Sequence, residues 1–273
     1  MFKRFICMFF LAVIAYPAMA TSHEDYQTAL ASWSRTLQLY VDERGRTDFR
    51  ALASDSDDLS QFVSFVESTS PASHPDLFAT EDEVLAYHIN AYNALAMYGV
   101  ISEDIPSDFD GFFKRLSFFK LRSVVIGGEK TSLYDYENKV IRPLDEPRVH
   151  FALNCMVRDC PRLPQEAFQA NTLEQQLEVA AQEFFNKDKH IRIDADKRTL
   201  YVSKILDFYT EDFVPSGKVR DLTEYVNRYA KMMVPEDYRV KFIDYNWTIN
   251  QQPAALTKSE AVTIDKYSIS EPG

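Results

Sequence analysis

The stretch from Arg148 to Pro161 has the sequence Arg-Val-His-Phe-Ala-Leu-Asn-Cys-Met-Val-Arg-Asp-Cys-Pro, and we expect the fold to form around it. Apolar residues alternate with others in its first half, at Val149, Phe151 and Leu153. Because side chains of a β-strand point alternately to its two faces, this period predicts a strand. The polar residues that follow predict a loop that ends at Pro161.

The same stretch holds two cysteines, Cys155 and Cys160, and a histidine, His150, five residues before the first of them. A thiolate needs a base or a cation to stabilise it, and an imidazole beside the sulfur is the usual arrangement. One interpretation is therefore a reactive thiol at Cys155. On a regular strand, residues 150 and 155 would face opposite sides, so their pairing requires the chain to turn after Asn154.

The cysteines allow two other interpretations. In an oxidising compartment, Cys155 and Cys160 can form a disulfide that pins the loop and removes the nucleophile. Alternatively, His150 and both cysteines are zinc ligands by residue type, but their spacing matches no familiar zinc pattern and a fourth ligand is not evident. We expect no metal and no other cofactor.

The first 20 residues have the layout of a secretory signal peptide. Lys3 and Arg4 precede an apolar run from Phe5 to Tyr16, and small residues stand before position 21. We expect residues 1–20 to be removed, together with Cys7, and the mature protein to be periplasmic or secreted. The alternative is an uncleaved anchor, which the short apolar core disfavours. No later apolar run reaches the ~18 residues of a membrane span, so none is expected in the mature chain.

Composition and charge limit the partners and the number of domains. The chain carries 30 Lys and Arg against 41 Asp and Glu, a net charge of −11, which disfavours binding to nucleic acid or to anionic membranes. We find no repeat, no low-complexity tract and no flexible linker. Residues 21–250 are therefore predicted to form one domain, and residues 251–273 a peripheral tail.

Common cofactor and hydrolase motifs are missing from the sequence. The seven glycines form neither a dinucleotide fingerprint nor a phosphate-binding loop. There is also no GxSxG elbow and no HExxH zinc motif. Any imidazole-based site must use one of five histidines.

Hydrophobic periodicity gives the order of elements. It predicts helices at residues 24–41, 59–66, 81–100, 133–141, 173–185, 204–209 and 219–232. Gly127 and Gly128 predict a hairpin between residues 121–126 and 129–133, a second hairpin is expected at 190–193 and 199–202, and a last strand at 238–243. The fold class is therefore α+β, with several helices packed on a mixed or antiparallel sheet.

Two groups of residues have predicted structural roles. The aromatic cluster of Phe112, Phe113, Phe118 and Phe119, with Leu116 among them, is expected to pack in the core. Asn90 and Asn93 lie on a helix that is expected to be buried. Because buried amides must be hydrogen bonded, we expect these two to hold neighbouring backbone in place.

Several segments together resemble a known family. They are residues 87–95 (Tyr-His-Ile-Asn-Ala-Tyr-Asn-Ala-Leu), 133–137, 145–161, 203–209, 212–213 and 244–247. By these segments the chain resembles the domain of unknown function 547 family. The resemblance implies a fold similar to papain and transglutaminase-like cysteine hydrolases, with a candidate constellation of Cys155, His150 and Glu137.

The resemblance leads to a hypothesis of an exported thiol-dependent hydrolase or amidase that acts on a peptide-like bond. Cys155 would attack an acyl carbon, His150 would accept the thiol proton, and Glu137 would orient the imidazole. Asn93 or backbone amides would stabilise the oxyanion. The alternative is a non-enzymatic exported binding or accessory domain that binds a peptide-like or small-molecule ligand, with Cys155–Cys160 as a structural disulfide.

Two arginines near this constellation also have two interpretations. Arg142 and Arg148 can bind a substrate carboxylate through two parallel hydrogen bonds. They can equally form ion pairs with Asp145, Glu146 or Glu137. On an acidic protein we favour ion pairing.

Overall fold

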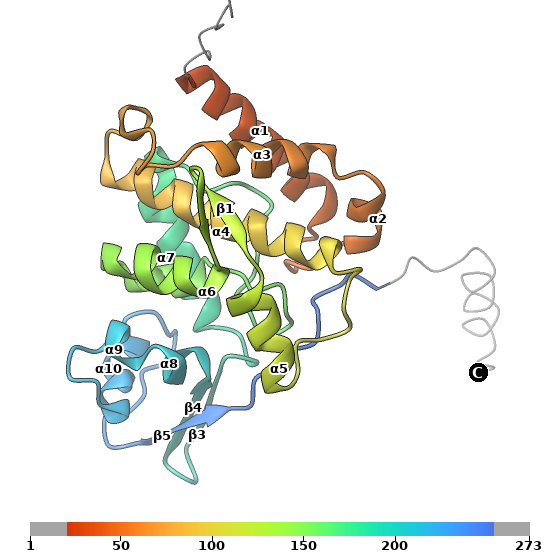
Figure 1. Cartoon of the computed structure of the whole chain (residues 1–273). Helices are drawn as coiled ribbons and strands as arrows, with labels where there is room; N and C mark the ends of the chain where they lie inside the picture. The colour runs from red at the N-terminus through yellow and green to blue at the C-terminus, as the bar shows by residue number, and fades with distance from the viewer. Residues whose placement is uncertain (1–20, 254–273) are drawn as a thin grey trace, which may run out of the picture.

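The computed structural model describes residues 21–253 (Figure 1). The predicted signal peptide, residues 1–20, and residues 254–273 of the predicted tail lie outside the described residues. Within residues 21–253, no helix has both the length and the hydropathy needed to cross a membrane.

The helices and strands follow the predicted order in most places. The α-helices are α1 (His23–Tyr40), α2 (Phe49–Ser54), α3 (Asp57–Ser68), α4 (Glu81–Ser102), α5 (Phe112–Arg115), α6 (Leu133–Tyr136), α7 (Leu173–Phe184), α8 (Ile205–Phe208), α9 (Thr210–Phe213) and α10 (Leu222–Asn227). The strands are β1 (Val124–Ile126), β2 (Glu129–Thr131), β3 (Ile191–Asp194), β4 (Thr199–Ser203) and β5 (Arg239–Ile243). Short π- and 3₁₀-helices extend several of the α-helices.

The N-terminal half is a layer of helices around α4. The side chain of Thr80 caps α4 by accepting from the Glu83 N–H, and the Glu83 carboxylate accepts from the Thr80 N–H. Most of α4 is buried on all sides, because α1, α3 and the β1–β2 hairpin cover it in the upper part of the molecule (Figure 1). The predicted turn at Gly127 and Gly128 is confirmed, and both glycines have positive φ angles.

The C-terminal half contains a mixed three-stranded sheet. Strand β4 pairs antiparallel with β3 and parallel with β5, in the order β3-β4-β5. Helices α8, α9 and α10 lie beside this sheet in the lower part of Figure 1. The predicted α+β class with a mixed sheet in a single domain is therefore confirmed.

Two hydrophobic clusters fill the molecule. The larger is formed by the N-terminal helices, the segment from α6 to the first half of α7, and Ile249, and the smaller by Phe151, the end of α7, the sheet and α8–α10. Tyr245, which follows β5, packs against both clusters. A groove lined by residues of both clusters lies between them.

The central strand predicted at residues 149–154 is wrong. Residues Pro147–Phe151 form a 3₁₀-helix, η5. Pro147 occupies its first turn, and the Glu146 side chain caps it by accepting from the Arg148 N–H at 2.9 Å. Val149, His150 and Phe151 are all buried, so the apolar alternation does not separate a core face from a solvent face.

The aromatic cluster is only partly in the core. Phe118 is fully buried, but Phe112 is 65% exposed and Phe113 is 80% exposed. The prediction of core packing is therefore wrong for these two side chains. Phe112 instead lines the groove between the two clusters.

The first residues of the predicted tail are part of the packed domain. The Gln251 side chain accepts from the Phe49 N–H at 3.1 Å, and the Gln252 N–H donates to the Thr47 carbonyl at 2.9 Å. The packed chain therefore extends past the predicted boundary at residue 250.

A buried histidine connects α4 to α6. Nδ1 of His88 and the hydroxyl of Tyr136 share a hydrogen bond of 2.6 Å. Burial lowers the pKa of His88 to about 4. Because Tyr136 directly precedes Glu137, this bond fixes the end of α6 from which Glu137 projects.

The His88 pKa predicts a pH dependence of stability. Between about pH 6.5 and pH 4 the unfolded state binds a proton at His88 that the folded state does not, so stability falls as the pH is lowered through this window. From pH 6.5 to pH 4.5, His88 should account for a loss of about 2 kcal/mol in the free energy of unfolding. Urea unfolding at both pH values should show this loss reduced in His88→Gln and unchanged in the exposed control His23→Gln. An identical pH dependence in His88→Gln and wild type would contradict the assignment.

Candidate functional site

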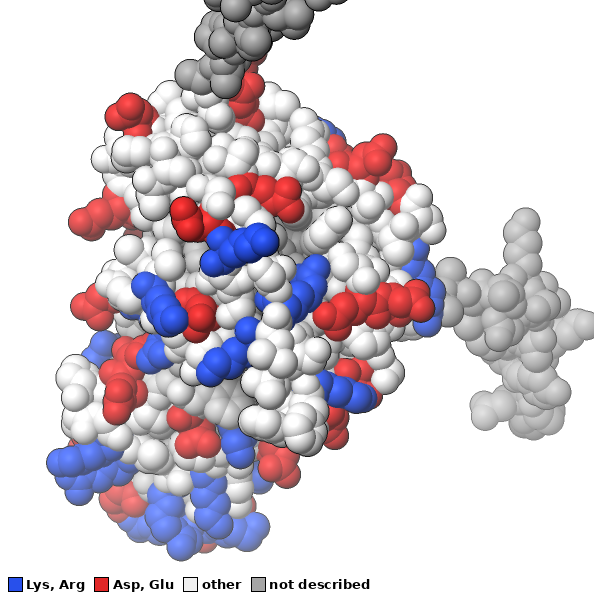
Figure 2. Space-filling view, viewed as in Figure 1, with Lys and Arg blue, Asp and Glu red and all other residues white. Residues whose placement is uncertain are grey.

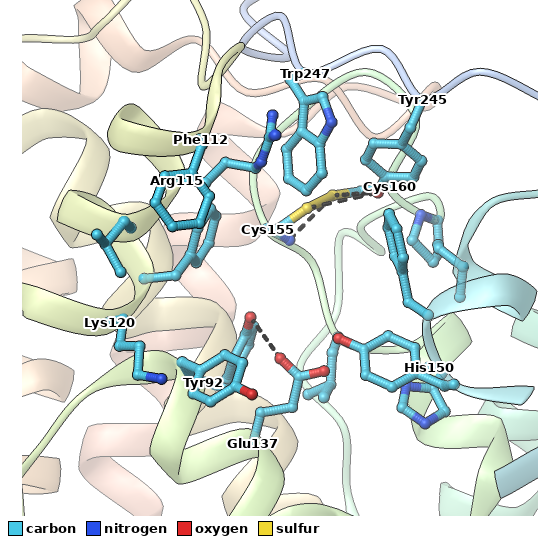
Figure 3. Close-up of a pocket in the computed structure, with 18 residues that line it drawn as sticks. Tyr92, Phe112, Arg115, Lys120, Glu137, His150, Cys155, Cys160, Tyr245 and Trp247 are labelled. Carbon is cyan, nitrogen blue, oxygen red and sulfur yellow. Dashed lines mark hydrogen bonds between the residues drawn. A yellow bond between two sulfur atoms is a disulfide. The ribbon is translucent and has the colours of Figure 1, made fainter. Parts of the chain in front are cut away.

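A pocket of about 420 Å³ opens between the two hydrophobic clusters (Figure 3). Side chains from α4, from α5 and the π-helix η2 (Leu116–Leu121), from α8 and from the segment after β5 line it. Eight of its lining residues are aromatic, including Phe112, Phe119, Tyr134, Phe208, Tyr245 and Trp247. This volume and lining are typical of small-molecule sites, which measure about 300–1,000 Å³ and are largely apolar.

A disulfide between Cys155 and Cys160 forms part of the pocket wall, with the two Cα atoms 6.2 Å apart. Cys155 is partly exposed, whereas Cys160 is only 2% exposed. The Cys155 N–H donates to the Cys160 sulfur at 3.1 Å, and the Tyr245 hydroxyl lies 3.6 Å from each sulfur. Cys155 is therefore not a free thiol in this structure.

The buried amide of Asn93 positions the cysteine loop. Its Nδ2 donates to the Ala152 carbonyl at 3.0 Å, and its Oδ1 accepts from the Asn154 N–H at 2.7 Å. Asn90 forms the equivalent pair of bonds with the backbone of Phe168, at 2.8 and 3.0 Å. The predicted backbone-holding role of both amides is therefore confirmed.

Glu137 projects into the pocket from the π-helix η3 (Glu137–Ile141), which continues α6. Its carboxylate is 9% exposed and accepts a hydrogen bond from the Tyr92 hydroxyl at 3.1 Å. The cations next to it in sequence are paired elsewhere, Lys139 with Asp135 and Arg142 with Asp212. The pocket thus contains a buried carboxylate that forms no ion pair with any residue from 21 to 253.

Two tyrosines next to Glu137 are held in the neutral form. Burial raises the pKa of Tyr92 and of Tyr209 well above the ordinary value, and the negative charge of Glu137 adds to the effect in both. Both hydroxyls are therefore protonated and can donate to the carboxylate. These hydroxyls supply hydrogen-bond donors to the carboxylate but no positive charge.

His150 lies on the Glu137 side of the pocket, away from the disulfide (Figure 3). Its Nε2 is 2.8 Å from the Asp212 carboxylate, and its ring stacks on Tyr209 with centroids 4.0 Å apart. The imidazole is thus oriented by Asp212. The sequence had predicted Glu137 in this role. Within the described chain His150 has no hydrogen bond to Cys155, so the predicted Cys-His-Glu constellation shares one pocket without forming a hydrogen-bonded triad.

Asp212 joins His150 to Arg142. Arg142 donates to both carboxylate oxygens of Asp212 at 2.6 Å. Burial opposes the charge on Asp212, but the hydrogen bonds from Arg142 and His150 outweigh it and hold the pKa of this carboxyl well below its usual range. The Arg142 guanidinium also lies over the Tyr209 ring, 5.2 Å from its centroid. The network therefore fixes Tyr209, which forms one wall of the pocket.

Arg142 and Arg148, for which the sequence favoured ion pairing, both form ion pairs. Arg148 pairs with Glu146, as predicted, and also with Glu174. Arg142 pairs with Asp212, a partner that the sequence did not indicate.

Two further cations, Arg115 and Lys120, line the pocket. The Arg115 guanidinium lies over Trp247 at 4.7 Å from the ring centroid, and the Lys120 ammonium lies over Tyr134 at the same distance. Arg115 also approaches Asp110 at 3.9 Å. Lys120 forms no ion pair with a residue that the structure describes, so the pocket has an available positive charge as well as a negative one.

Several residues of the site were not predicted from the sequence: Tyr92, Arg115, Lys120, Tyr209, Asp212, Tyr245 and Trp247. Tyr245 and Trp247 stand in segment 244–247, and Asp212 in segment 212–213, both of which resemble the family. The resemblance therefore pointed to these positions but assigned them no role. Arg115 and Lys120 lie outside the segments that resemble the family.

No group of three or more His, Cys, Asp or Glu side chains in residues 21–253 is arranged to hold a metal.

The family comparison confirms the resemblance. Residues 77–185 match the family described as "Protein of unknown function, DUF547". This region includes Glu137, His150, Cys155 and Cys160, whereas Asp212, Tyr245 and Trp247 lie beyond its end. No curated protein and no solved structure matches this chain.

The Asp212 network predicts a measurable effect on stability. Asp212→Asn leaves the Arg142 charge without its partner in a partly buried site, so the free energy of unfolding should fall by about 2 kcal/mol. Asp207→Asn, on the exposed side of the neighbouring helix α8, is the matched control and should change it by less than about 0.5 kcal/mol. Denaturant unfolding at pH 7 measures both. Equal stability of the two variants would show that the network does not contribute.

Proposed function

We propose that this protein is an exported binding domain whose pocket holds a small peptide-like molecule with a positively charged and a negatively charged end. The observation that carries the proposal is the unpaired, buried carboxylate of Glu137 inside an aromatic pocket. A ligand ammonium placed there supplies the missing counter-charge and gains cation–π contacts with the surrounding rings.

Two lining cations support the second half of the proposal. Arg115 and Lys120 provide donors for a ligand carboxylate, and the aromatic rings of the lining provide an apolar surface for the ligand body. The outer surface of the protein also carries charges of both signs. On the face seen in Figure 2, acidic and basic side chains are intermixed and form no continuous basic surface of the kind that binds nucleic acid.

The dipeptide Phe-Phe tests this proposal by calorimetry and by tryptophan fluorescence. Trp33 is buried in the core and Trp247 lines the pocket, so a ligand-induced change should come from Trp247 and be lost in Trp247→Phe. N-acetylation of Phe-Phe removes the ammonium and should weaken binding at least tenfold, about 1.4 kcal/mol. Glu137→Gln should weaken binding of Phe-Phe to a similar extent and leave the acetylated form unaffected. Glu129→Gln, at an exposed position on β2, is the control.

The opposite result would overturn the proposal. If Phe-Phe and its N-acetylated form bind equally to wild type, or if Glu137→Gln weakens both to the same extent, the carboxylate does not recognise an ammonium group. An undetectable affinity for Phe-Phe would likewise contradict the proposed ligand class.

The thiol-dependent hydrolase or amidase is the second candidate function, favoured by the position of Cys155, His150 and Glu137 around one pocket. It requires reduction of the disulfide and a hydrogen bond between His150 and Cys155, with Asp212 in the orienting role that the sequence had assigned to Glu137. A fold similar to papain or transglutaminase stays a prediction from the family resemblance.

Alkylation of the reduced protein distinguishes the two functions. In a binding domain, His150 belongs to the Asp212 network, and His150→Gln should leave the rate of Cys155 alkylation by iodoacetamide at pH 7 within about twofold of wild type. In a hydrolase, the same change removes the thiolate partner and should slow alkylation at least tenfold. Mass spectrometry of the peptide that contains Cys155 measures the rate.

A further inference from the structure

The two sulfurs of the pocket disulfide differ in their surroundings. Both cysteines line the pocket, but Cys155 is partly exposed whereas Cys160 is buried. A sulfur atom from outside can therefore reach Cys155 through the pocket more readily than it can reach Cys160. Thiol–disulfide exchange depends on which sulfur is attacked and on how well the departing thiolate is stabilised.

The surroundings of Cys160 stabilise a departing thiolate. The Cys155 N–H points at its sulfur from 3.1 Å, and the Tyr245 hydroxyl lies 3.6 Å away. The Lys189 ammonium donates to the backbone carbonyl of Cys160 at 3.0 Å. Hydrogen-bond donors at the sulfur itself favour the thiolate.

The loop does not depend on the disulfide for its shape. Asn154 donates to the Pro161 carbonyl at 2.7 Å and accepts from the Met156 N–H at 2.8 Å. Val157 pairs with Ile249 in a β-bridge, and the Arg158 N–H donates to the Thr248 carbonyl at 2.9 Å. The backbone from 154 to 161 therefore stays in place when the sulfur–sulfur bond opens.

From this asymmetry we propose that the Cys155–Cys160 disulfide is a thiol-exchange site that accepts a small-molecule thiol from the pocket at Cys155. The incoming thiolate bonds to the Cys155 sulfur, the bond to Cys160 breaks, and Cys160 leaves with the electron pair as a thiolate. A second thiolate then attacks the added sulfur, which releases the Cys155 thiolate and a small-molecule disulfide. Two external thiols are oxidised while the protein disulfide is reduced to two thiols.

The test uses the folded chain and 2-mercaptoethanol, a neutral probe that does not depend on Glu137 or Lys120. Folded wild-type protein is mixed with the probe and quenched with iodoacetamide, and its peptides are mapped by mass spectrometry. We expect the probe adduct on Cys155 and the carbamidomethyl group on Cys160, with at least ten times more of this product than of the reverse one. Comparable amounts of both products, or adducts that form only after unfolding in urea, would overturn the proposal.

Variants extend the test to each sulfur separately. With bis(2-hydroxyethyl) disulfide, Cys160→Ala should form a mixed disulfide at Cys155 at least tenfold faster than Cys155→Ala forms one at Cys160. Circular dichroism checks that both variants are folded, and the wild-type mapping stands on its own if either is not. Equal rates in two folded variants would contradict the assigned direction of attack.

Tyr245→Phe isolates the hydroxyl near the sulfurs. In the reduced protein, the pH at which alkylation of Cys160 is half-maximal should rise in Tyr245→Phe, because one thiolate donor is lost. Tyr238→Phe, outside the pocket, should leave it unchanged. An unchanged value in Tyr245→Phe would show that the hydroxyl does not stabilise the thiolate. Because these readouts do not involve Phe-Phe, failure of the exchange site and failure of the proposed peptide binding are distinguishable.

Discussion

The pair of hydrogen bonds from the Asn93 amide determines where the chain turns on its way into the pocket. These bonds hold the backbone on both sides of Leu153 against the buried helix α4. A buried amide that satisfies both a donor and an acceptor of the main chain is costly to displace, since it would leave several polar groups unpaired. The position of Cys155 at the pocket wall therefore follows from the packing of α4.

Some charged side chains around the pocket stabilise the fold by pairing with one another, and others are available to a ligand. Asp212, Arg142 and His150 satisfy one another and hold Tyr209 in place. Within residues 21–253 Glu137 forms no ion pair, and its carboxylate accepts a hydrogen bond from the Tyr92 hydroxyl in a largely apolar site. Such an arrangement has a cost in folding, and a ligand with a matching charge offsets that cost on binding.

Periodicity predicted most helices, both hairpins and the last strand, because burial of one face is a local property of the sequence. It failed at residues 149–154, where every side chain is enclosed and the alternation of apolar residues carried no information about a face. It also failed at Phe112 and Phe113, since exposure of an aromatic ring depends on packing partners that are distant in sequence. The candidate residues Glu137, His150 and Cys155 do share one pocket. The bond from His150 to Asp212 could not be predicted, because 62 residues separate the two and local periodicity does not indicate contacts between distant residues.

The central claim is that Glu137 recognises the positively charged end of a ligand inside the aromatic pocket. A crystal structure of the protein with bound Phe-Phe tests it most directly. The account predicts the dipeptide ammonium within hydrogen-bonding distance of a Glu137 carboxylate oxygen, its carboxylate toward Lys120 and Arg115, and its rings against the aromatic walls. A dipeptide bound with the reverse orientation, or bound outside this pocket, would contradict the account.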